Sequence, residues 1–276
     1  MFTILSATGK TGSEIIKFFS AAGIPCNAVT SDLSRSVILP HINWVENNIP
    51  AGTKKLFLNT AVTADMFDVQ RRFIDTAKDA GVEHIVKLST PGASPTSKDR
   101  TGQVHWQIEE YLRNSGMNWN SLQPQTFMQN WLGNLANNVR QERKIYAVAG
   151  DGKKAFTDTR DIGEVAFTLL TDPKKYINKI IPLSGPAPVS YYEVAAAISD
   201  AIGETVTYIP QTPEEGKARM EKAGFPEWAV QMNLLVDMGQ RSGAAEKLFS
   251  DNVAEILGKP GRSIYDFAKD HSKSFI

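Results

Sequence analysis

A glycine-containing turn after the first apolar segment constrains the fold of this chain more than any other feature. Residues 2–5 (Phe-Thr-Ile-Leu) predict a buried strand, and residues 14–19 predict a helix with its apolar side chains on one side. Between them, Gly9 and Gly12 stand at the spacing of a Gly-x-x-Gly-x-x-Gly turn in which Ser6 takes the first glycine position. This order of strand, turn and helix is typical of the first βα unit of a dinucleotide-binding sheet.

The turn predicts phosphate binding, because backbone N–H groups and the positive end of the helix dipole would hold a pyrophosphate there. Gly9 would let the backbone approach the ligand, and Gly12 would let the helix pack on the strand. Ser6 requires either a turn that tolerates its Cβ or a hydrogen bond from its hydroxyl. The expected cofactor contacts are Ser6, Thr8, Gly9, Lys10, Thr11 and Gly12. The alternative is a tight turn without a ligand; a P-loop is excluded because Ile4 stands where that motif needs a glycine.

Short apolar segments then alternate with longer amphipathic ones. This pattern predicts strands at 26–30, 42–45, 55–59, 84–88 and 119–122, and helices at 66–77 and 101–114. Asp65 is expected to cap the helix that begins at residue 66. Strands and helices that alternate at this spacing imply right-handed βαβ crossovers, so the predicted fold class is α/β with a doubly wound parallel sheet.

The C-terminal part has a different character. A helix at 161–170 and a strand at 179–183 are expected first, and helices then dominate at 191–202, 213–223, 226–238 and 251–257. We expect a dinucleotide-binding domain of residues 1–125 plus about 155–185, and a smaller, helix-rich lid of about 126–154 plus 186–276. The Lys/Ser-rich tail after His271 is expected to fray.

Composition excludes several classes of function. The 276 residues carry 30 Lys+Arg and 30 Asp+Glu, and a formal net charge of zero argues against binding nucleic acid or anionic membranes by bulk electrostatics. One cysteine and four scattered histidines predict neither an internal disulfide nor a metal site. No apolar run approaches the ~20 residues of a membrane span, and no signal peptide is recognised at the N-terminus. We expect a cytoplasmic monomer or homodimer that acts on a small molecule.

Several motifs in order along the chain resemble the NmrA-like group of atypical short-chain dehydrogenases. They lie at residues 7–12, 73–89, 109–116, 127–130, 150–153 and 161–166. Within this group, Gly9-Lys10-Thr11 and Gly102-Gln103-Val104-His105 are similar to the fungal ergot-alkaloid reductases, which reduce an iminium carbon with NADPH. The resemblance implies a Rossmann domain with a small C-terminal substrate lid.

The resemblance also sets the expected activity. Members of the group include NAD(P)H-dependent reductases of quinones, imines and dyes, redox-sensing regulators that bind the cofactor without turnover, and redox-neutral cyclases. We expect an NADP(H)-dependent reductase of a hydrophobic imine, iminium or conjugated carbonyl compound. The sensor and the cyclase stay open as alternatives, because a fold does not determine a reaction.

The choice between NADP and NAD depends on residues after the second strand. The family usually places an arginine where this chain has Ser31, and no acidic residue that would select NAD stands at Thr30. Lys10 and Arg35 are the basic residues that could reach a 2′-phosphate, so NADP is favoured over NAD. Further cofactor contacts are expected at strand ends, from Asn59, Thr60, Ala61, Ser89, Thr90, Gln123, Gln125 and Phe127.

The catalytic Tyr-x-x-x-Lys pair of short-chain dehydrogenases is missing. By the resemblance, Thr101 falls at the tyrosine position and His105 at the lysine position. His105 could bind the nicotinamide ribose or relay a proton, or it could be a packing histidine. Ser89 could hold the carboxamide or a polar group of the substrate, or cap a strand end. Hydride delivery to a pre-activated C=N⁺ acceptor needs no strong acid, which agrees with the missing pair.

Aromatic residues at the expected lid are candidates for substrate contact. We select Trp106, Phe127, Trp131 and Trp228. Apolar residues at helical spacing also build cores, so some of these side chains are expected to serve packing.

Overall fold

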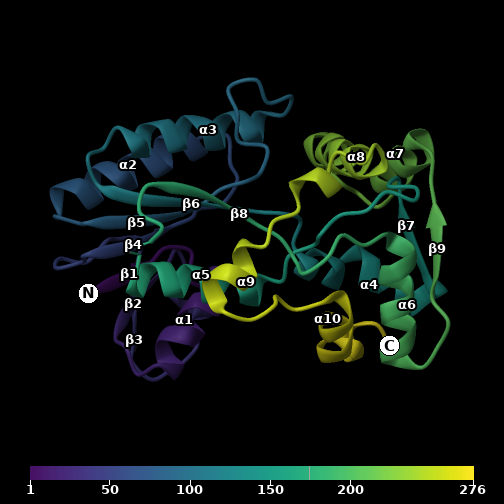
Figure 1. The fold of residues 1–276 in the computed structure, drawn as a ribbon, viewed down its shortest axis with the longest axis horizontal. Helices are drawn as coiled ribbons and strands as arrows, with labels where there is room; N and C mark the ends of the chain where they lie inside the picture. The colour runs from purple at the N-terminus through teal and green to yellow at the C-terminus, as the bar shows by residue number, and fades with distance from the viewer. Residues whose placement is uncertain (174) are drawn as a thin grey trace. The chain divides into compact units, whose positions relative to one another are not determined.

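The computed structural model describes residues 1–173 and 175–276, and this part of the chain divides into two compact units (Figure 1). The first unit comprises Met1–Pro124, Thr159–Leu183 and Glu255–Lys259. The second comprises Gln125–Asp158, Ser184–Ala254 and Pro260–Ile276. We describe each unit by itself.

The first unit is built on a parallel sheet. Among the described residues the sheet has seven strands in the order β3-β2-β1-β4-β5-β6-β8, and every neighbouring pair is parallel. The strands are β1 (Phe2–Ile4), β2 (Cys26–Thr30), β3 (Ile42–Glu46), β4 (Lys55–Leu58), β5 (His84–Leu88), β6 (Asn118–Pro124) and β8 (Lys179–Leu183). The strand order reverses between β1 and β4, which makes their carboxyl ends a topological switch point. The predicted doubly wound parallel sheet is confirmed.

Helices cover both faces of this sheet. Helices α1 (Gly12–Ala21) and α5 (Thr159–Thr171) lie on one face, and α2 (Met66–Asp79) and α3 (Arg100–Arg113) lie on the other (Figure 1). Between the sheet and α2 and α3, the buried side chains include Leu56, Leu58, Ile74, Ile85 and Ile108. A strand that is buried on both faces has a continuous run of apolar residues. This is why the strands of the sheet could be predicted from the sequence.

The second unit is mostly helical, with α4 (Asn134–Glu142), α6 (Tyr191–Ile202), α7 (Pro213–Lys222), α8 (Glu227–Arg241) and α10 (Ile264–Asp270). Helix α9 (Asn252–Leu257) crosses the boundary between the units. In the described residues, a parallel pair of strands, β7 (Lys144–Ala147) and β9 (Thr207–Pro210), also belongs to this unit. The sequence analysis did not predict this pair, because four-residue strands without alternation leave little signal.

One local prediction was wrong, and a second was confirmed in position only. The C-terminal tail is ordered rather than frayed, because Phe275 is fully buried in the core of the second unit and Ser272–Ser274 form a 3-10 turn. Asp65 stands at the N-cap position of α2, but its carboxylate accepts the hydroxyl of Thr63 instead of a helix N–H.

Close approach of α1 and α5 depends on Gly163. A Cβ at this position would lie 2.7 Å from the Cβ of Glu14 in α1. We predict that Gly163→Ala lowers the free energy of unfolding by about 1–3 kcal/mol through overpacking. Gly239→Ala in α8 is the matched control, because a Cβ there meets nothing within 4 Å. It should raise stability by about 0.5–1 kcal/mol through helix propensity. Urea unfolding of both variants checks this, and equal effects would contradict the packing.

Candidate nucleotide site and buried polar network

The turn after β1 is held by hydrogen bonds that start from Ser6. This residue has a φ of +53°, in the left-handed region that favours glycine, and its carbonyl accepts the N–H of Gly9 at 2.9 Å. Its Oγ donates to the carbonyl of Asn59 at 3.0 Å, which links the end of β1 to the end of β4. The turn therefore tolerates the Cβ of Ser6 and also uses its hydroxyl, the two alternatives raised by the sequence.

The start of α1 is packed directly on this turn. A Cβ at Gly12 would lie 2.3 Å from the Ser6 carbonyl oxygen and 2.9 Å from the Cα of Ala7, so only glycine fits. A Cβ at Gly9 would meet the Ser6 oxygen at 3.1 Å. Thr11, the N-cap of α1, is buried, and its Oγ1 has no hydrogen-bond partner. A helix N-terminus with an unsatisfied buried hydroxyl suits an anionic ligand.

A pocket of about 430 Å³ opens at the carboxyl ends of β1, β2 and β4. It brings together eight of the predicted cofactor residues, namely Ser6, Thr8, Gly9, Ser31, Arg35, Asn59, Thr60 and Ala61. Leu5, Val29, Thr30, Asn47, Val69 and Phe73 complete its wall. Lys10, Thr11 and Gly12 belong to the same turn but do not line this pocket. A polar rim with an apolar wall at the switch point fits a nucleotide.

Six lining residues were not selected from the sequence as site residues, namely Leu5, Val29, Thr30, Asn47, Val69 and Phe73. Asn47 follows the last residue of β3 and has a φ of +47°, and Val69 and Phe73 lie on α2. The predicted strand ends at residue 45, so Asn47 lies two residues beyond it at the carboxyl edge, where an asparagine is a typical loop residue.

Arg35 is the cationic residue in the pocket lining. It ends the 3-10 turn Leu33–Arg35 after β2, is exposed, and donates through Nη2 to the Thr8 carbonyl at 3.5 Å. Asp32 caps this turn by accepting the N–H of Ser34 at 2.9 Å and its hydroxyl at 2.6 Å. These hydrogen bonds lower the pKa of Asp32, so its carboxylate stabilises the turn that carries Arg35.

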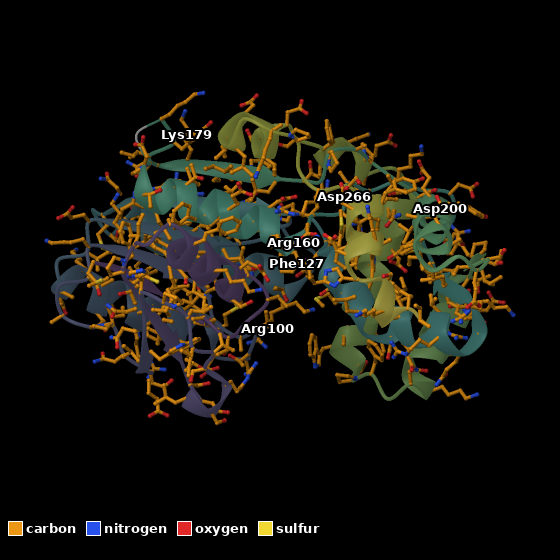
Figure 2. All side chains as sticks on the ribbon, turned by 90° about the horizontal axis from the view of Figure 1, so that it is seen from below. Arg100, Phe127, Arg160, Lys179, Asp200 and Asp266 are labelled. Carbon is orange, nitrogen blue, oxygen red and sulfur yellow. The ribbon has the colours of Figure 1, made fainter. Side chains whose placement is uncertain are left out.

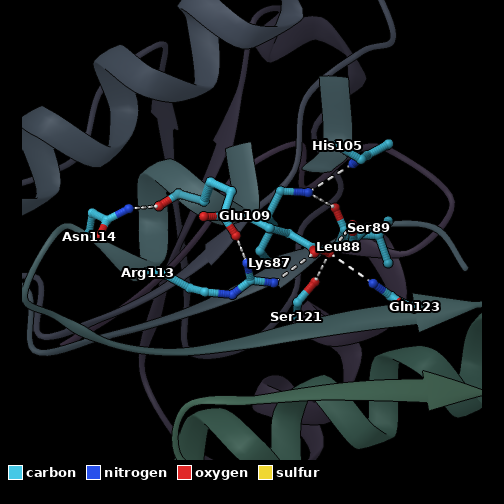
Figure 3. A network of polar contacts seen from close by, with 10 residues as sticks. Lys87, Leu88, Ser89, His105, Glu109, Arg113, Asn114, Ser121 and Gln123 are labelled. Carbon is cyan, nitrogen blue, oxygen red and sulfur yellow. Dashed lines mark hydrogen bonds and ion pairs between the residues drawn. The ribbon is translucent and has the colours of Figure 1, made fainter. Parts of the chain in front are cut away.

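A second group of polar side chains is buried around Glu109 of α3 (Figure 3). Its Oε1 accepts hydrogen bonds from Ser89 Oγ at 2.6 Å, Ser121 Oγ at 2.6 Å and Gln123 Nε2 at 3.0 Å. Its Oε2 faces Arg113 Nη2 at 3.4 Å. Ser89 and Gln123 were predicted to contact the cofactor. In the structure, both side chains donate hydrogen bonds to the Glu109 carboxylate. Their contact with a cofactor stays a prediction, as does that of Thr90 in the next loop.

Lys87 of β5 contacts His105 of α3 in the same network (Figure 3). Lys87 is fully buried, and its Nζ lies 2.8 Å from His105 Nδ1 and 3.0 Å from the Leu88 carbonyl oxygen. Burial lowers the pKa of Lys87 to about 7, and the nearby Glu109 carboxylate opposes this shift. Burial and the charge of Lys87 hold the pKa of His105 well below its usual range. His105 is therefore a neutral imidazole at pH 7.

Neither Lys87 nor Glu109 was selected from the sequence. Lys87 stands inside the apolar run His84–Leu88, whose five residues are all buried. The sequence did contain a signal for Lys87, which is a lysine within a strand that is predicted to be buried on both faces. Such a lysine requires a partner. Glu109 appeared only as part of a motif, and helical periodicity alone did not separate it from the exposed Gln107.

The predicted substrate residues differ in exposure. Trp131 lies in the core of the second unit, with its ring 4.9 Å from Phe156 and 5.5 Å from Phe267, so packing accounts for its position. Trp228 on α8 is 59% exposed. Phe127 (Figure 2) is half-buried as the N-cap of the 3-10 turn Met128–Leu132. Half-buried Trp106 belongs to α3, and buried Gln125 donates to the Ala245 carbonyl at 3.3 Å.

The described residues contain no group of three or more His, Cys, Asp or Glu side chains arranged to hold a metal ion. In the same part of the chain, no helix is long and apolar enough to cross a membrane.

The sheet order, the glycine turn and the pocket at the switch point define a Rossmann-type α/β protein with a nucleotide-binding site. Comparison with known families then identifies the group. The NmrA-like family model matches residues 1–248, and the chain belongs to this family.

Several of its relatives are oxidoreductases by name. The chain is 33% identical to an NAD(P)H azoreductase from Xenophilus azovorans, over 100% of this chain and 99% of that one. It is 27% identical to an agroclavine dehydrogenase from Claviceps fusiformis, over 99% and 98% of the two chains. The fold resembles the crystal structure of an NADPH-dependent quinone oxidoreductase from Escherichia coli with a TM-score of 0.86, at 23% identity and over 98% and 99% of the chains.

The Glu109 network should contribute measurably to stability. In Glu109→Gln, an oxygen at Oε1 could still accept from Ser89, Ser121 and Gln123, but the new amide N–H₂ would face Arg113. We predict a loss of about 1–3 kcal/mol in the free energy of unfolding. Glu110→Gln is the matched control, because Glu110 also pairs with Arg113 but is 39% exposed, and it should lose less than about 1 kcal/mol. Similar losses in urea unfolding would mean that the buried acceptor has no special role.

Proposed function

We propose that this protein is an NADP(H)-dependent reductase of a hydrophobic imine, iminium or conjugated carbonyl compound. The observation that carries the proposal is the pocket at the switch point, lined by the glycine turn and by Arg35. The names of the related azoreductase and agroclavine dehydrogenase support an oxidoreductase that uses NAD(P)H. When bound, the cofactor supplies a hydride to the substrate.

The chain offers separate groups for the parts of the dinucleotide. The turn at residues 6–12 and the N-terminus of α1 would bind the pyrophosphate. Arg35 and Ser31 at the end of β2 would bind the 2′-phosphate that distinguishes NADP from NAD. Asn59, Thr60 and Ala61 would orient the dinucleotide along the end of β4.

His105 would orient the nicotinamide ribose or the substrate with its Nε2–H. Since its Nδ1 contacts Lys87 Nζ, the ring is fixed in one orientation. Two aromatic residues of the second unit, the half-buried Phe127 and the exposed Trp228, would contact the substrate. A regulator would bind the cofactor in the same pocket without turnover, and a redox-neutral cyclase would keep the cofactor there as a scaffold. NADPH oxidation with a panel of aromatic imines, quinones and enones tests the choice, and no oxidation with any of them would favour these alternatives.

Dinucleotide binding should fail when a branched side chain enters the turn. We predict that Gly9→Val weakens NADPH binding at least about a hundredfold, because a side chain at this position displaces the pyrophosphate from the backbone. Isothermal calorimetry measures the affinity, and circular dichroism checks that the variant is folded. A folded variant that binds NADPH as tightly as the parent would place the cofactor elsewhere.

Preference for NADPH should rest on Arg35. A charge-assisted hydrogen bond to the 2′-phosphate contributes about 1.5–3 kcal/mol, so Arg35→Ala should lower the NADPH:NADH affinity ratio about tenfold or more. Lys10→Ala is the comparison variant, since Lys10 belongs to the turn but does not line the pocket. The ratio should change less in that variant. If Lys10→Ala alone lowers the ratio, the 2′-phosphate contact belongs to Lys10.

A further inference from the structure

Reduction of a conjugated carbonyl requires a proton as well as a hydride. The tyrosine that supplies it in short-chain dehydrogenases is replaced here by Thr101. His105 alone is a poor acid source at neutral pH, because it is held neutral. A proton donor in contact with His105 is therefore needed.

We infer that Lys87 and His105 form a proton relay, in which Lys87 is the proton source and His105 Nε2–H is the group that meets the acceptor. The inference rests on the proposed function and deepens it. The relay would supply the proton that a carbonyl-type acceptor needs. Carbonyl-type acceptors would therefore be among the substrates that this chain is equipped to reduce.

The relay is built by two hydrogen bonds. Lys87 Nζ donates to the Leu88 carbonyl at 3.0 Å and contacts His105 Nδ1 at 2.8 Å. When Lys87 is protonated, its ammonium group has only donors, so Nδ1 accepts and the ring proton lies on Nε2. Lys87 is fully buried and cannot touch a ligand, whereas His105 retains 7% exposure. Lys87 can therefore act only through the imidazole.

The transfer balances in protons and electrons. When a hydride adds to a conjugated carbonyl acceptor, an electron pair moves to the acceptor oxygen. That oxygen takes the Nε2 proton, while Nδ1 takes a proton from Lys87 Nζ. The products are the reduced acceptor, a neutral imidazole with its proton on Nδ1, and a neutral Lys87 amine. Solvent then protonates Nε2, and Nδ1 returns its proton to Lys87.

The surroundings support a proton donor that works near neutral pH. Lys87 contacts the titratable His105 and is influenced by the Glu109 carboxylate, which pairs with Arg113; His105, Glu109 and Arg113 belong to α3. The side chains that donate to Glu109 from β6 and from the end of β5, which are Ser89, Ser121 and Gln123, are neutral. The β4 neighbour of Lys87, Leu58, is apolar. Burial lowers the pKa of Lys87 to about 7, and an acid whose pKa is close to the working pH is an efficient donor.

Two acceptors distinguish the relay from a structural role. A naphthoquinone needs a hydride and a proton, whereas the cationic dye crystal violet needs only a hydride. We predict that Lys87→Met lowers kcat/KM with the quinone about a hundredfold and changes it less than about threefold with the dye. Lys55→Met, the same substitution at the first residue of β4, is the matched control and should leave both values near those of the parent.

The pH profile gives a second test. Lys87 must be protonated to donate, so kcat/KM of the parent with the quinone should be level below about pH 7 and fall about tenfold per unit above it. With the dye this limb should be absent. In Lys87→Met it should be absent with both acceptors.

A measurement without cofactor checks the geometry. In ¹⁵N NMR of the free protein, the His105 ring, assigned by comparison with His105→Gln, should be neutral with its proton on Nε2. Lys87→Met should shift the Nδ1 signal. A parent ring with its proton on Nδ1 would overturn the relay.

The outcomes separate the two proposals. If the parent oxidises NADPH with neither acceptor and with no member of the imine, quinone and enone panel, the proposed function fails and the relay fails with it. If the parent reduces both acceptors and Lys87→Met lowers both rates equally, or neither, the relay is overturned while the reductase stands.

Discussion

The packing of the first turn against the start of α1 is the contact on which the nucleotide site depends. Ser6 adopts a left-handed conformation, and its carbonyl oxygen would lie 2.3 Å from any Cβ at Gly12. The absence of a side chain at Gly12 lets the helix begin directly above the end of β1. Its N-terminus is therefore aimed at the switch point of the sheet, where the carboxyl ends of β2 and β4 supply the remaining polar groups.

The buried network on α3 holds ionisable side chains in the absence of water. Three ionisable side chains, Lys87, His105 and Glu109, are almost completely removed from water. Burial of a charge is unfavourable unless hydrogen bonds replace water, and Glu109 receives them from Ser89, Ser121 and Gln123. The same burial moves the pKa of Lys87 from that of an ordinary lysine to about 7. Burial thus lowers the pKa of a lysine that contacts His105.

Several helices and strands of both units were predictable, because the apolar patterns and capping residues that define them are local in sequence. The strand at residues 26–30 and the helix at 191–202 have the predicted bounds, since apolar runs and capping residues define them. The pocket contains eight predicted residues because carboxyl ends of parallel strands meet at one edge. Lys87 and Glu109 were missed because their role comes from a contact between β5, β6 and α3 that sequence periodicity does not encode. The buried Phe275 and the β7–β9 pair likewise depend on tertiary packing.

The central claim is that the turn at residues 6–12 and Arg35 hold a phosphorylated dinucleotide whose reactive end reaches His105. A crystal structure of the protein with NADP⁺ tests it most directly. The account predicts the pyrophosphate against the N-terminus of α1, the 2′-phosphate within hydrogen-bond distance of Arg35, and the nicotinamide ribose or ring next to His105 Nε2. A dinucleotide bound away from this turn, or a nicotinamide remote from His105, would contradict it.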